Sequence, residues 1–278
     1  MKTRLPTRWR KVAAAALTVP ATLLAAQGAS AQPISNDWQF HAIIYAFLPE
    51  IGGSTKFPVE TGGSSVNVDA DTILNNLKFA FMGSLEAQKG YWGAFTDVMY
   101  LDVGGSKSNT RNVSIGGVDL PGGITSDLSL DIKGTAWTLG GSYRWLATTD
   151  ASGDVFVGAR LLSLKERLGW KFSADFDGIT GPLRENSNEQ KIDNWDGIIG
   201  AKGRVALGQG SKWYVPYYVD VGTGDSDLTW QAMAGIGYAF DGWNLLAAWR
   251  YLDYDFKSSQ KIESVTFNGP MIGVGFTW

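Results

Sequence analysis

The chain of 278 residues contains no cysteine and a single histidine, His41. Without cysteine, disulfide bonds, thiolate catalysis and cysteine-ligated zinc are excluded. Long apolar segments are also missing from the rest of the chain after residue 31. The longest apolar run there is 42–48, which is far shorter than the roughly 20 residues of a membrane-spanning helix. Helical periodicity is nearly absent, because apolar residues occur in short alternating segments between turn residues. These absences favour an all-β protein.

The first 31 residues differ from the rest of the chain. A basic start is followed by the apolar run 12–26 and by Ala29-Ser30-Ala31, which fits a cleavage site for a secretory signal peptide. The alternative, a membrane anchor, is disfavoured because Pro20 interrupts a short apolar run. The segment holds five of the 24 basic residues and none of the 27 acidic ones, so its removal leaves a net charge of about −8. We therefore expect a mature domain over 32–278 and no nucleic-acid partner.

The mature region contains ten segments that alternate with the period of two expected for β-strands. Short connections such as Lys89-Gly90 and Asp241-Gly242 alternate with the long connections 49–76, 104–126 and 171–192. Such alternation places the long and short connections at opposite ends of an up-and-down sheet. The ten predicted strands are Trp38 to Leu48, Leu77 to Gln88, Tyr91 to Val103, Asp127 to Leu146, Val155 to Trp170, Asp193 to Leu207, Trp213 to Gly222, Leu228 to Phe240, Trp243 to Phe256 and Val265 to Trp278.

One face of these segments is apolar with aromatic residues near both ends, as a wall that contacts lipid requires. A sheet edge in hydrocarbon would leave backbone groups unsatisfied, which predicts closure into a barrel. Two segments drift out of phase, near Gly134 and near Leu161 to Leu164, and each drift predicts a β-bulge. The predicted aromatic girdle comprises Trp38, Trp213, Trp230, Tyr238, Phe240, Trp243, Trp249 and Tyr251.

The last segment, GPMIGVGFTW, has apolar residues at alternate positions and ends in an aromatic residue: Ile272, Val274, Phe276 and Trp278. It resembles the C-terminal signature of bacterial outer-membrane β-barrels, whose usual last residue is Phe. The resemblance implies a closed, antiparallel, up-and-down transmembrane β-barrel surrounded by outer-membrane lipid and lipopolysaccharide. It also implies the barrel-assembly machinery and periplasmic chaperones as partners. Ten strands are expected; eight or twelve would follow if 223–227 is not an outer loop, and a secreted β-sandwich is the soluble alternative.

The opposite faces of the strands would point into the lumen and carry charges of both signs. Five of these charges are expected at similar heights near the middle of the barrel. They could form a hydrogen-bonded plug in place of a hydrophobic core, or line a narrow aqueous path for small solutes. Lumen glycines, among them Gly235, Gly237, Gly273 and Gly275, favour the second alternative. The predicted lumen cluster is Glu86, Asp97, Arg160, Lys202, Arg204, Asp220 and Arg250.

Three features could carry chemistry but have simpler explanations. His41 should point into the lumen near the periplasmic rim, without a motif that supplies an acid partner, whereas the chemistry of omptin-like proteases lies at the extracellular end. The acid pairs Asp225/Asp227 and Asp175/Asp177 read equally well as turns. We expect no catalytic residue, metal site or cofactor. The segment Asp69 to Leu77 predicts a helical turn, with Asp71 able to cap it and Ile73, Leu74 and Leu77 closing the outer mouth or lying at the membrane interface.

The sequence thus predicts a non-enzymatic outer-membrane barrel with a structural or surface-interaction role through its long extracellular loops. A narrow passive channel for small solutes is the first alternative. An enzyme that hydrolyses lipid or peptide is a more distant one.

Overall fold

The computed structural model describes residues 34–55, 64–115, 118–176, 179–258 and 262–278. The predicted signal peptide lies outside these residues. No helix in the described ranges is long and apolar enough to cross a membrane. The elements are β1 (Gln39–Phe47), β2 (Glu50–Thr55), β3 (Ser64–Val68), α2 (Ala70–Asn75), β4 (Leu77–Lys89), β5 (Trp92–Ile115), β6 (Val118–Ala147), β7 (Ala151–Phe176), β8 (Ile179–Ala206), β9 (Trp213–Gly224), β10 (Ser226–Ala239), β11 (Trp243–Phe256) and β12 (Ile262–Thr277).

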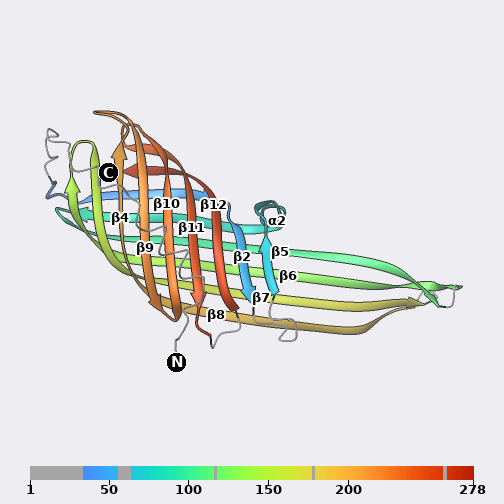
Figure 1. Ribbon diagram of the computed structural model, residues 1–278. Coiled ribbons are helices and arrows are strands. Elements are labelled where there is room, and N and C mark those ends of the chain that lie inside the picture. Colours follow the sequence, from blue (N-terminus) through green and yellow to red (C-terminus); the bar gives the residue numbers. More distant parts are fainter. Residues whose placement is uncertain (1–33, 56–63, 116–117, 177–178, 259–261) are drawn as a thin grey trace, which may run out of the picture.

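Within the described residues, ten strands form a closed antiparallel barrel. Strands β4 to β11 each pair with the next strand along the chain, and β1 pairs with both β4 and β12 (Figure 1). The short strands β2 and β3 form a hairpin that continues the sheet along β12. The prediction of an all-β, up-and-down barrel of ten strands is therefore confirmed.

One end of the barrel carries the short turns, and we call it the turn end. The turn glycines Gly90, Gly208, Gly210 and Gly242 have positive φ angles, a conformation that side chains with a Cβ rarely adopt. The seam between β1 and β12 also closes at this end: the Phe40 amide donates to the Trp278 carbonyl oxygen at 2.9 Å, and the Trp278 amide donates to the Phe40 carbonyl oxygen at 3.1 Å. We call the opposite end the extension end.

Four neighbouring strands continue far beyond the rest of the wall at the extension end. Strands β5, β6, β7 and β8 have 24, 30, 26 and 28 residues, whereas β9 has 12. Beyond Val103, β5 continues for roughly 40 Å, given a rise of about 3.3 Å per residue. Figure 1 shows this four-stranded extension projecting past the barrel.

The connections predicted over 104–126 and 171–192 are therefore wrong, because most of their residues lie in β-strands. Their many Gly, Ser and Asn residues are typical of loops. However, the strands of a sheet are held together by backbone hydrogen bonds, which do not depend on the side chains. The barrel part of β5 to β8 already sets the register in which these residues pair. The loop predicted over 223–227 is also shorter than expected, since only Asp225 separates β9 from β10.

The helical turn predicted at Asp69 to Leu77 is present as α2. Asp71 lies in its first turn and is not the cap; the residue before the helix is Asp69, whose carbonyl oxygen accepts from the Ile73 amide at 3.1 Å. Ile73 is buried, whereas Leu74 and Leu77 are exposed. The helix thus buries one apolar side chain and leaves the other two outside.

Side chains alternate strictly across the wall. In β11 the outward residues Trp243, Leu245 and Trp249 are exposed, and the inward residues Leu246 and Arg250 are buried. The sequence predicted this assignment of faces.

The bulges predicted near Gly134 and near Leu161 to Leu164 are absent, because β6, β7 and β8 pair without a shift through both positions. The β6–β7 register shifts instead at Arg144/Leu146. What changes near Leu161 is the location of the apolar residues. Leu162 and Leu164 are buried inside, while Ser163 and Lys165 lie on the outer face.

The same inversion occurs in β11. Beyond Tyr251, the inward positions become apolar and the outward positions become acidic. Leu252, Tyr254 and Phe256 are buried, whereas Asp253 and Asp255 alternate with them on the outer face. Along β7 and β11, therefore, the large apolar side chains lie outside toward the turn end and inside toward the extension end.

Candidate functional site

The lumen on the turn-end side contains a cavity of about 370 Å³. It begins at rim residues, among them Gln39, Thr148 and Thr277, and extends to a layer that includes Tyr45, Asp97 and Arg250. Aliphatic and aromatic side chains line it together with charged ones. The charged residues of its wall are Glu86, Asp97, Arg144, Asp154, Lys202, Arg204 and Arg250.

Two ion pairs lie in the part of this cavity nearest the rim: Lys202–Glu86 joins β8 to β4, whereas Arg144–Asp154 joins the neighbouring strands β6 and β7. Lys202 Nζ lies 2.5 Å from Glu86 Oε2 and over the ring of Phe95. Arg144 makes a bidentate contact with Asp154: its Nε donates to Oδ1 at 2.8 Å and its Nη2 donates to Oδ2 at 3.1 Å. Arg204 lies over the Tyr214 ring, 5.7 Å from its centroid. The sequence names Lys202 and Glu86 as inward charges without pairing them, and it names neither Arg144 nor Asp154.

Arg250 closes the cavity on its inner side. Its Nη2 donates to Asp97 Oδ1 and to Gln231 Oε1, both at 2.9 Å, and its Nη1 donates to the Tyr45 hydroxyl at 2.9 Å. The Tyr45 hydroxyl in turn donates to Asp97 Oδ2 at 2.9 Å. These bonds tie β1, β5, β10 and β11 together across the lumen, so Arg250 acts as a crosslink between four strands.

Arg160 and Asp220 form a second crosslink. Both Nη atoms of Arg160 contact the carboxylate, and its Nε donates to Thr138 Oγ1 at 3.3 Å. The side chains are 1% and 0% exposed, which makes this the most deeply buried ion pair of the described residues. A buried pair of this kind is held in place by its fork geometry, because either charge alone would be costly to bury.

The structure therefore places all seven predicted lumen charges on the inward face but at different heights. Arg160, Asp220, Arg250 and Asp97 lie in the two crosslinks, whereas Lys202 pairs with Glu86 nearer the turn end. Arg204 lies near the rim. The prediction of one common mid-barrel height is wrong for Lys202, because it lies four residues from the turn-end limit of β8 at Ala206, whereas Arg160 lies nine residues from the turn-end limit of β7 at Ala151.

A third buried polar group was not predicted. Asp196 accepts from the Ser226 amide at 2.9 Å, from Ser226 Oγ at 2.9 Å and from Asn194 Nδ2 at 2.6 Å. All three residues are at most 1% exposed. The Asn-Trp-Asp sequence of β8 could have signalled it, since Asn194 and Asp196 share the inward face on either side of an outward Trp195.

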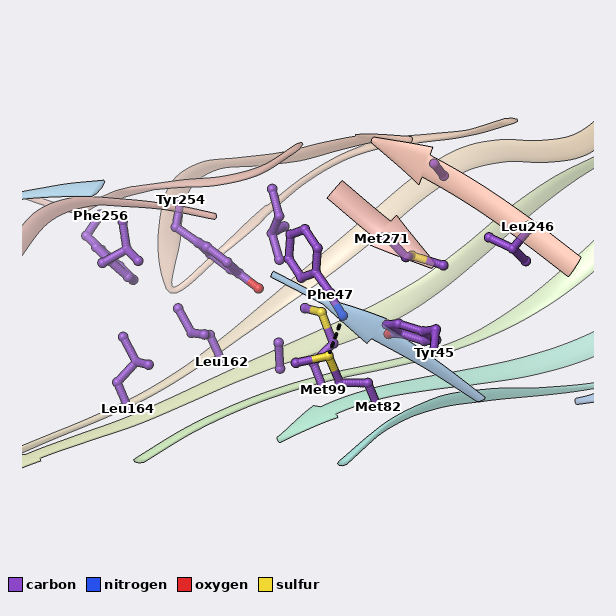
Figure 2. Packing of buried hydrophobic residues seen from close by; sticks show 14 residues of the cluster. Tyr45, Phe47, Met82, Met99, Leu162, Leu164, Leu246, Tyr254, Phe256 and Met271 are labelled. Carbon is purple, nitrogen blue, oxygen red and sulfur yellow. Dashed lines mark hydrogen bonds between the residues drawn. The ribbon is translucent and has the colours of Figure 1, made fainter. Parts of the chain in front are cut away.

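An apolar cluster begins at Leu246 and Met271 in the cavity wall and continues past the Arg250 layer toward the extension end. In Figure 2, Phe47 lies between one group with Tyr45, Leu246 and Met271 and another with Leu162 and Tyr254. The Phe47 amide contacts Met82 Sδ at 3.2 Å. The full cluster is Tyr45, Phe47, Met82, Met99, Ala136, Leu162, Leu164, Leu246, Ala248, Leu252, Tyr254, Phe256, Val265 and Met271.

This cluster corrects the expectation that polar groups replace a hydrophobic core. The charged layers exist, but the extension-end half of the barrel has an apolar core of its own. The lumen glycines do not open a path either. A Cβ on Gly237 would lie 2.2 Å from the Tyr214 ring, and one on Gly275 would lie 2.6 Å from Asn244 Oδ1. Their small size makes room for neighbouring side chains.

The predicted girdle residues form two groups on the outer surface. At the turn end, the Trp213–Tyr238, Tyr238–Phe240 and Phe240–Trp243 ring centroids are 4.0 to 4.9 Å apart, and Trp38 stacks on Phe40. Further along the strands, Trp230 stacks on Tyr251 at 4.7 Å, and Trp249 Nε1 donates to Asn268 Oδ1 at 2.7 Å. Between these groups the outer surface is aliphatic: Val157 is 62% exposed and Ile272 is 64% exposed.

The four residues of the predicted assembly signal alternate along β12 toward the seam. Ile272, Phe276 and Trp278 are exposed on the outer face, Val274 is half-buried, and Trp278 stacks on Phe40 at 5.8 Å. Ile272, Val274 and Phe276 pair with Ala46, Ile44 and Ala42 of β1. The C-terminal residues are thus part of the closing seam.

The candidate catalytic groups have structural partners. His41 Nδ1 lies 2.9 Å from the Thr277 hydroxyl, and in the described part of the chain its ring has no carboxylate hydrogen-bond partner. Asp225 Oδ2 accepts from the Trp195 amide at 2.9 Å, which fixes the β9–β10 turn. Asp177 lies outside the described residues. Among the residues that the structure describes, no three acids or histidines are placed to hold a metal ion.

Comparison with known proteins finds no matching family model and no matching curated protein. The solved structures that the chain resembles are outer-membrane β-barrel proteins. The outer membrane protease OmpT of Escherichia coli has 11% identity and a TM-score of 0.40 over 87% of this chain and 97% of its own. The translocator domain of autotransporter NalP of Neisseria meningitidis has 16% identity and a TM-score of 0.33 over 96% and 95%.

The attachment invasion locus protein Ail of Yersinia pestis has 11% identity and a TM-score of 0.31 over 87% of this chain and 98% of its own. All three TM-scores are low. The assignment of the fold therefore depends on the strand pairings themselves.

Proposed function

We propose that this chain is a non-enzymatic protein of a bacterial outer membrane whose lumen is sealed and whose role is surface interaction through the four-stranded extension. The single observation that carries this proposal is the inversion of the apolar face along the strands. It divides the barrel into a part suited to lipid and a part suited to water.

The lipid-facing part is the turn-end half. Its aliphatic outer surface is flanked by two groups of aromatic residues, the arrangement that amphipathic rings adopt at both membrane interfaces. Along β11, Trp243 to Tyr251 matches the about 9–11 residues that a tilted strand needs to cross a bilayer. Outer-membrane lipid and lipopolysaccharide are the surroundings we propose, with a cleaved signal peptide and the barrel-assembly machinery acting in biogenesis.

The sealing of the lumen has two components. The Arg160–Asp220 and Arg250–Asp97 crosslinks span the middle of the lumen. The apolar cluster fills the lumen from these crosslinks toward the extension end. An ion crossing this region would have to leave water, which is expensive in an apolar core. This favours the non-conducting alternative over a narrow passive channel.

The extension supports a role at the surface. A sheet that continues roughly 40 Å past the barrel, on the side away from the turn end, is longer than closure of the barrel requires. Binding surfaces are often carried on such projecting segments of rigid scaffolds.

The membrane part of the proposal is tested by folding into detergent or lipid. The folded chain should migrate differently from boiled chain on a denaturing gel and should be protected from protease over the turn-end half. Equal mobility, together with solubility in detergent-free buffer, would contradict a membrane barrel.

The surface role is tested by shortening the extension. We would join Gly104 to Asp131, which pair directly, through an Asn-Gly turn, and compare cells that display the shortened and full-length chains. Adhesion to cell or matrix surfaces should fall at least severalfold while gel mobility and surface amount stay the same. A variant that carries only Ser108→Ala and Ser126→Ala provides a full-length control. Unchanged adhesion of the shortened variant would exclude this hairpin.

The channel alternative is tested in a planar bilayer. The folded barrel should give no discrete conductance steps, whereas truncation of the seal in a Phe47→Ala/Leu252→Ala double variant should produce them. Steps in the unmodified chain whose ion preference responds to Asp97→Asn would replace the sealed barrel with a channel.

A further inference from the structure

The turn-end cavity has properties that the sealed-barrel role does not use. At about 370 Å³, its volume is within the range of small-molecule sites. Its rim residues Gln39 and Thr277 are exposed, so a solute can enter from the turn end. This inference does not depend on the surface role proposed above, because it concerns the opposite end of the molecule.

The charge in the cavity wall is unbalanced by one. Each of the three carboxylates has its own cation: Glu86 pairs with Lys202, Asp154 with Arg144, and Asp97 with Arg250. Among the described residues that line the cavity, the remaining cation is Arg204, which has no carboxylate within ion-pair distance and contacts the Tyr214 ring instead. The wall therefore carries a net charge of about +1 with His41 neutral.

The small adjoining cavity at the rim does not remove this excess. It measures about 110 Å³ and shares Arg204, and it adds Asp150 and Lys212, one charge of each sign. Asp150 Oδ1 is already engaged by the Gly210 amide at 3.2 Å. Among the described residues of the two cavities, no carboxylate is therefore within ion-pair distance of Arg204.

The rest of the wall favours an organic ligand over a bare ion. Ile43, Phe95, Leu246 and Met271 offer apolar surface deeper in the cavity, while Arg204 and the His41–Thr277 pair provide polar groups nearer the rim. Ligand sites commonly combine an apolar wall with a few polar groups that fix orientation. An arginine guanidinium matches a carboxylate with two parallel hydrogen bonds.

We propose that the turn-end cavity binds a small organic monoanion, with its carboxylate at Arg204 and its apolar body against Leu246 and Met271. One negative charge neutralises the cavity wall, whereas a dianion would reverse its sign. A neutral analogue would leave Arg204 without a partner.

The probe is 3-(4-fluorophenyl)propionate, added to the folded full-length barrel in a non-ionic detergent and followed by ¹⁹F NMR. Saturable binding is expected, with the corresponding amide at least about tenfold weaker because it lacks the charge-assisted contact. Arg204→Gln should weaken the carboxylate at least about tenfold. Lys89→Gln removes the same charge at the same end without touching the cavity and should leave binding unchanged.

A variant that changes the charge in the other direction sharpens the test. Glu86→Gln releases Lys202 and raises the wall to about +2, so binding of the carboxylate should become severalfold tighter. Gel mobility of every variant establishes that it is folded. The proposal is overturned if the amide and the carboxylate bind equally, if Arg204→Gln and Lys89→Gln behave alike, or if folded barrel shows no saturation at millimolar probe.

Discussion

The two halves of this barrel are built with opposite interiors. The turn-end half is apolar on its outer surface and holds a hollow, charged lumen, whereas the extension-end half places acidic residues outside and a packed apolar cluster inside. The antiparallel pairing continues through both halves, and β11 pairs with β12 along its whole length without a register shift. The two halves therefore differ in side chains and not in backbone pairing, and under the function proposed above the position where the pattern inverts marks the boundary between lipid and water.

Breaking a buried ion pair and breaking a water-accessible one should give the largest difference in the free energy of unfolding. Arg160→Met leaves Asp220 buried without a partner, and we expect a loss of about 3–5 kcal/mol in the free energy of unfolding. Lys202→Met leaves Glu86 at the edge of the open cavity, where water can solvate it, and should cost about 1 kcal/mol. Urea titration of the barrel in lipid vesicles, followed by tryptophan fluorescence, measures both. Equal losses would mean that the cavity is not wet.

Truncation of leucine compares the packed and hollow halves directly. Leu162→Ala removes a side chain that is 1% exposed within the apolar cluster and should cost about 2–5 kcal/mol. Leu246→Ala enlarges a cavity that already exists and should cost about 2 kcal/mol or less, because no new void is created. The same titration is the readout, and a larger loss for Leu246→Ala would reverse the comparison.

Glycine substitutions compare the lumen face with the outer face. Gly237→Ala forces a Cβ into the Tyr214 ring and should cost about 1–3 kcal/mol. Gly141→Ala meets only a backbone oxygen at 3.9 Å on the outer wall, so its effect should stay within about 0.5 kcal/mol. Thermal unfolding on denaturing gels would rank the two, and a tolerated Gly237→Ala would indicate that Tyr214 can move into the cavity.

The smallest effect is expected at the cavity mouth. His41→Ala removes the contacts of the ring with the Thr277 hydroxyl and with the Phe276 backbone at a partly exposed position, and should cost about 1 kcal/mol. Any lipase or protease activity detected in the folded chain should persist in this variant. Complete loss of such an activity would place His41 in a catalytic site.

The fold could be predicted largely because alternation is a local property. Trp243, Leu245 and Trp249 share a face whatever surrounds them, so the ten strands and the inward charges follow from the sequence. Leu162 and Leu164 were misread as signs of a bulge because we assumed a single pattern for the whole strand. In β7 the apolar side chains move from the outer face to the inner face near Leu161, and a single facing pattern for the whole strand does not allow for this change.

Contacts across the lumen could not be predicted in the same way. The sequence identifies Arg250 as inward, but its bonds to Tyr45 and Asp97 join β11 to strands that are not its neighbours in the ladder. The extension was missed for a related reason, since its glycine-rich segments become strands through the register set by the barrel. The unbalanced Arg204 depends on which cations reach which acids, and that depends on side-chain lengths in three dimensions.

The seam between β1 and β12 has a consequence for the time course of folding. His41 and Thr277, which touch across it, are 236 positions apart in the chain. The other wall strands pair with strands that are close to them in the sequence. The pairing of β1 with β12 can form only after the strands between them have assembled. Contacts of such separation form slowly. The last step of folding should therefore be the zipping of this seam, and until then β1 and β12 both present open edges to any other strand nearby.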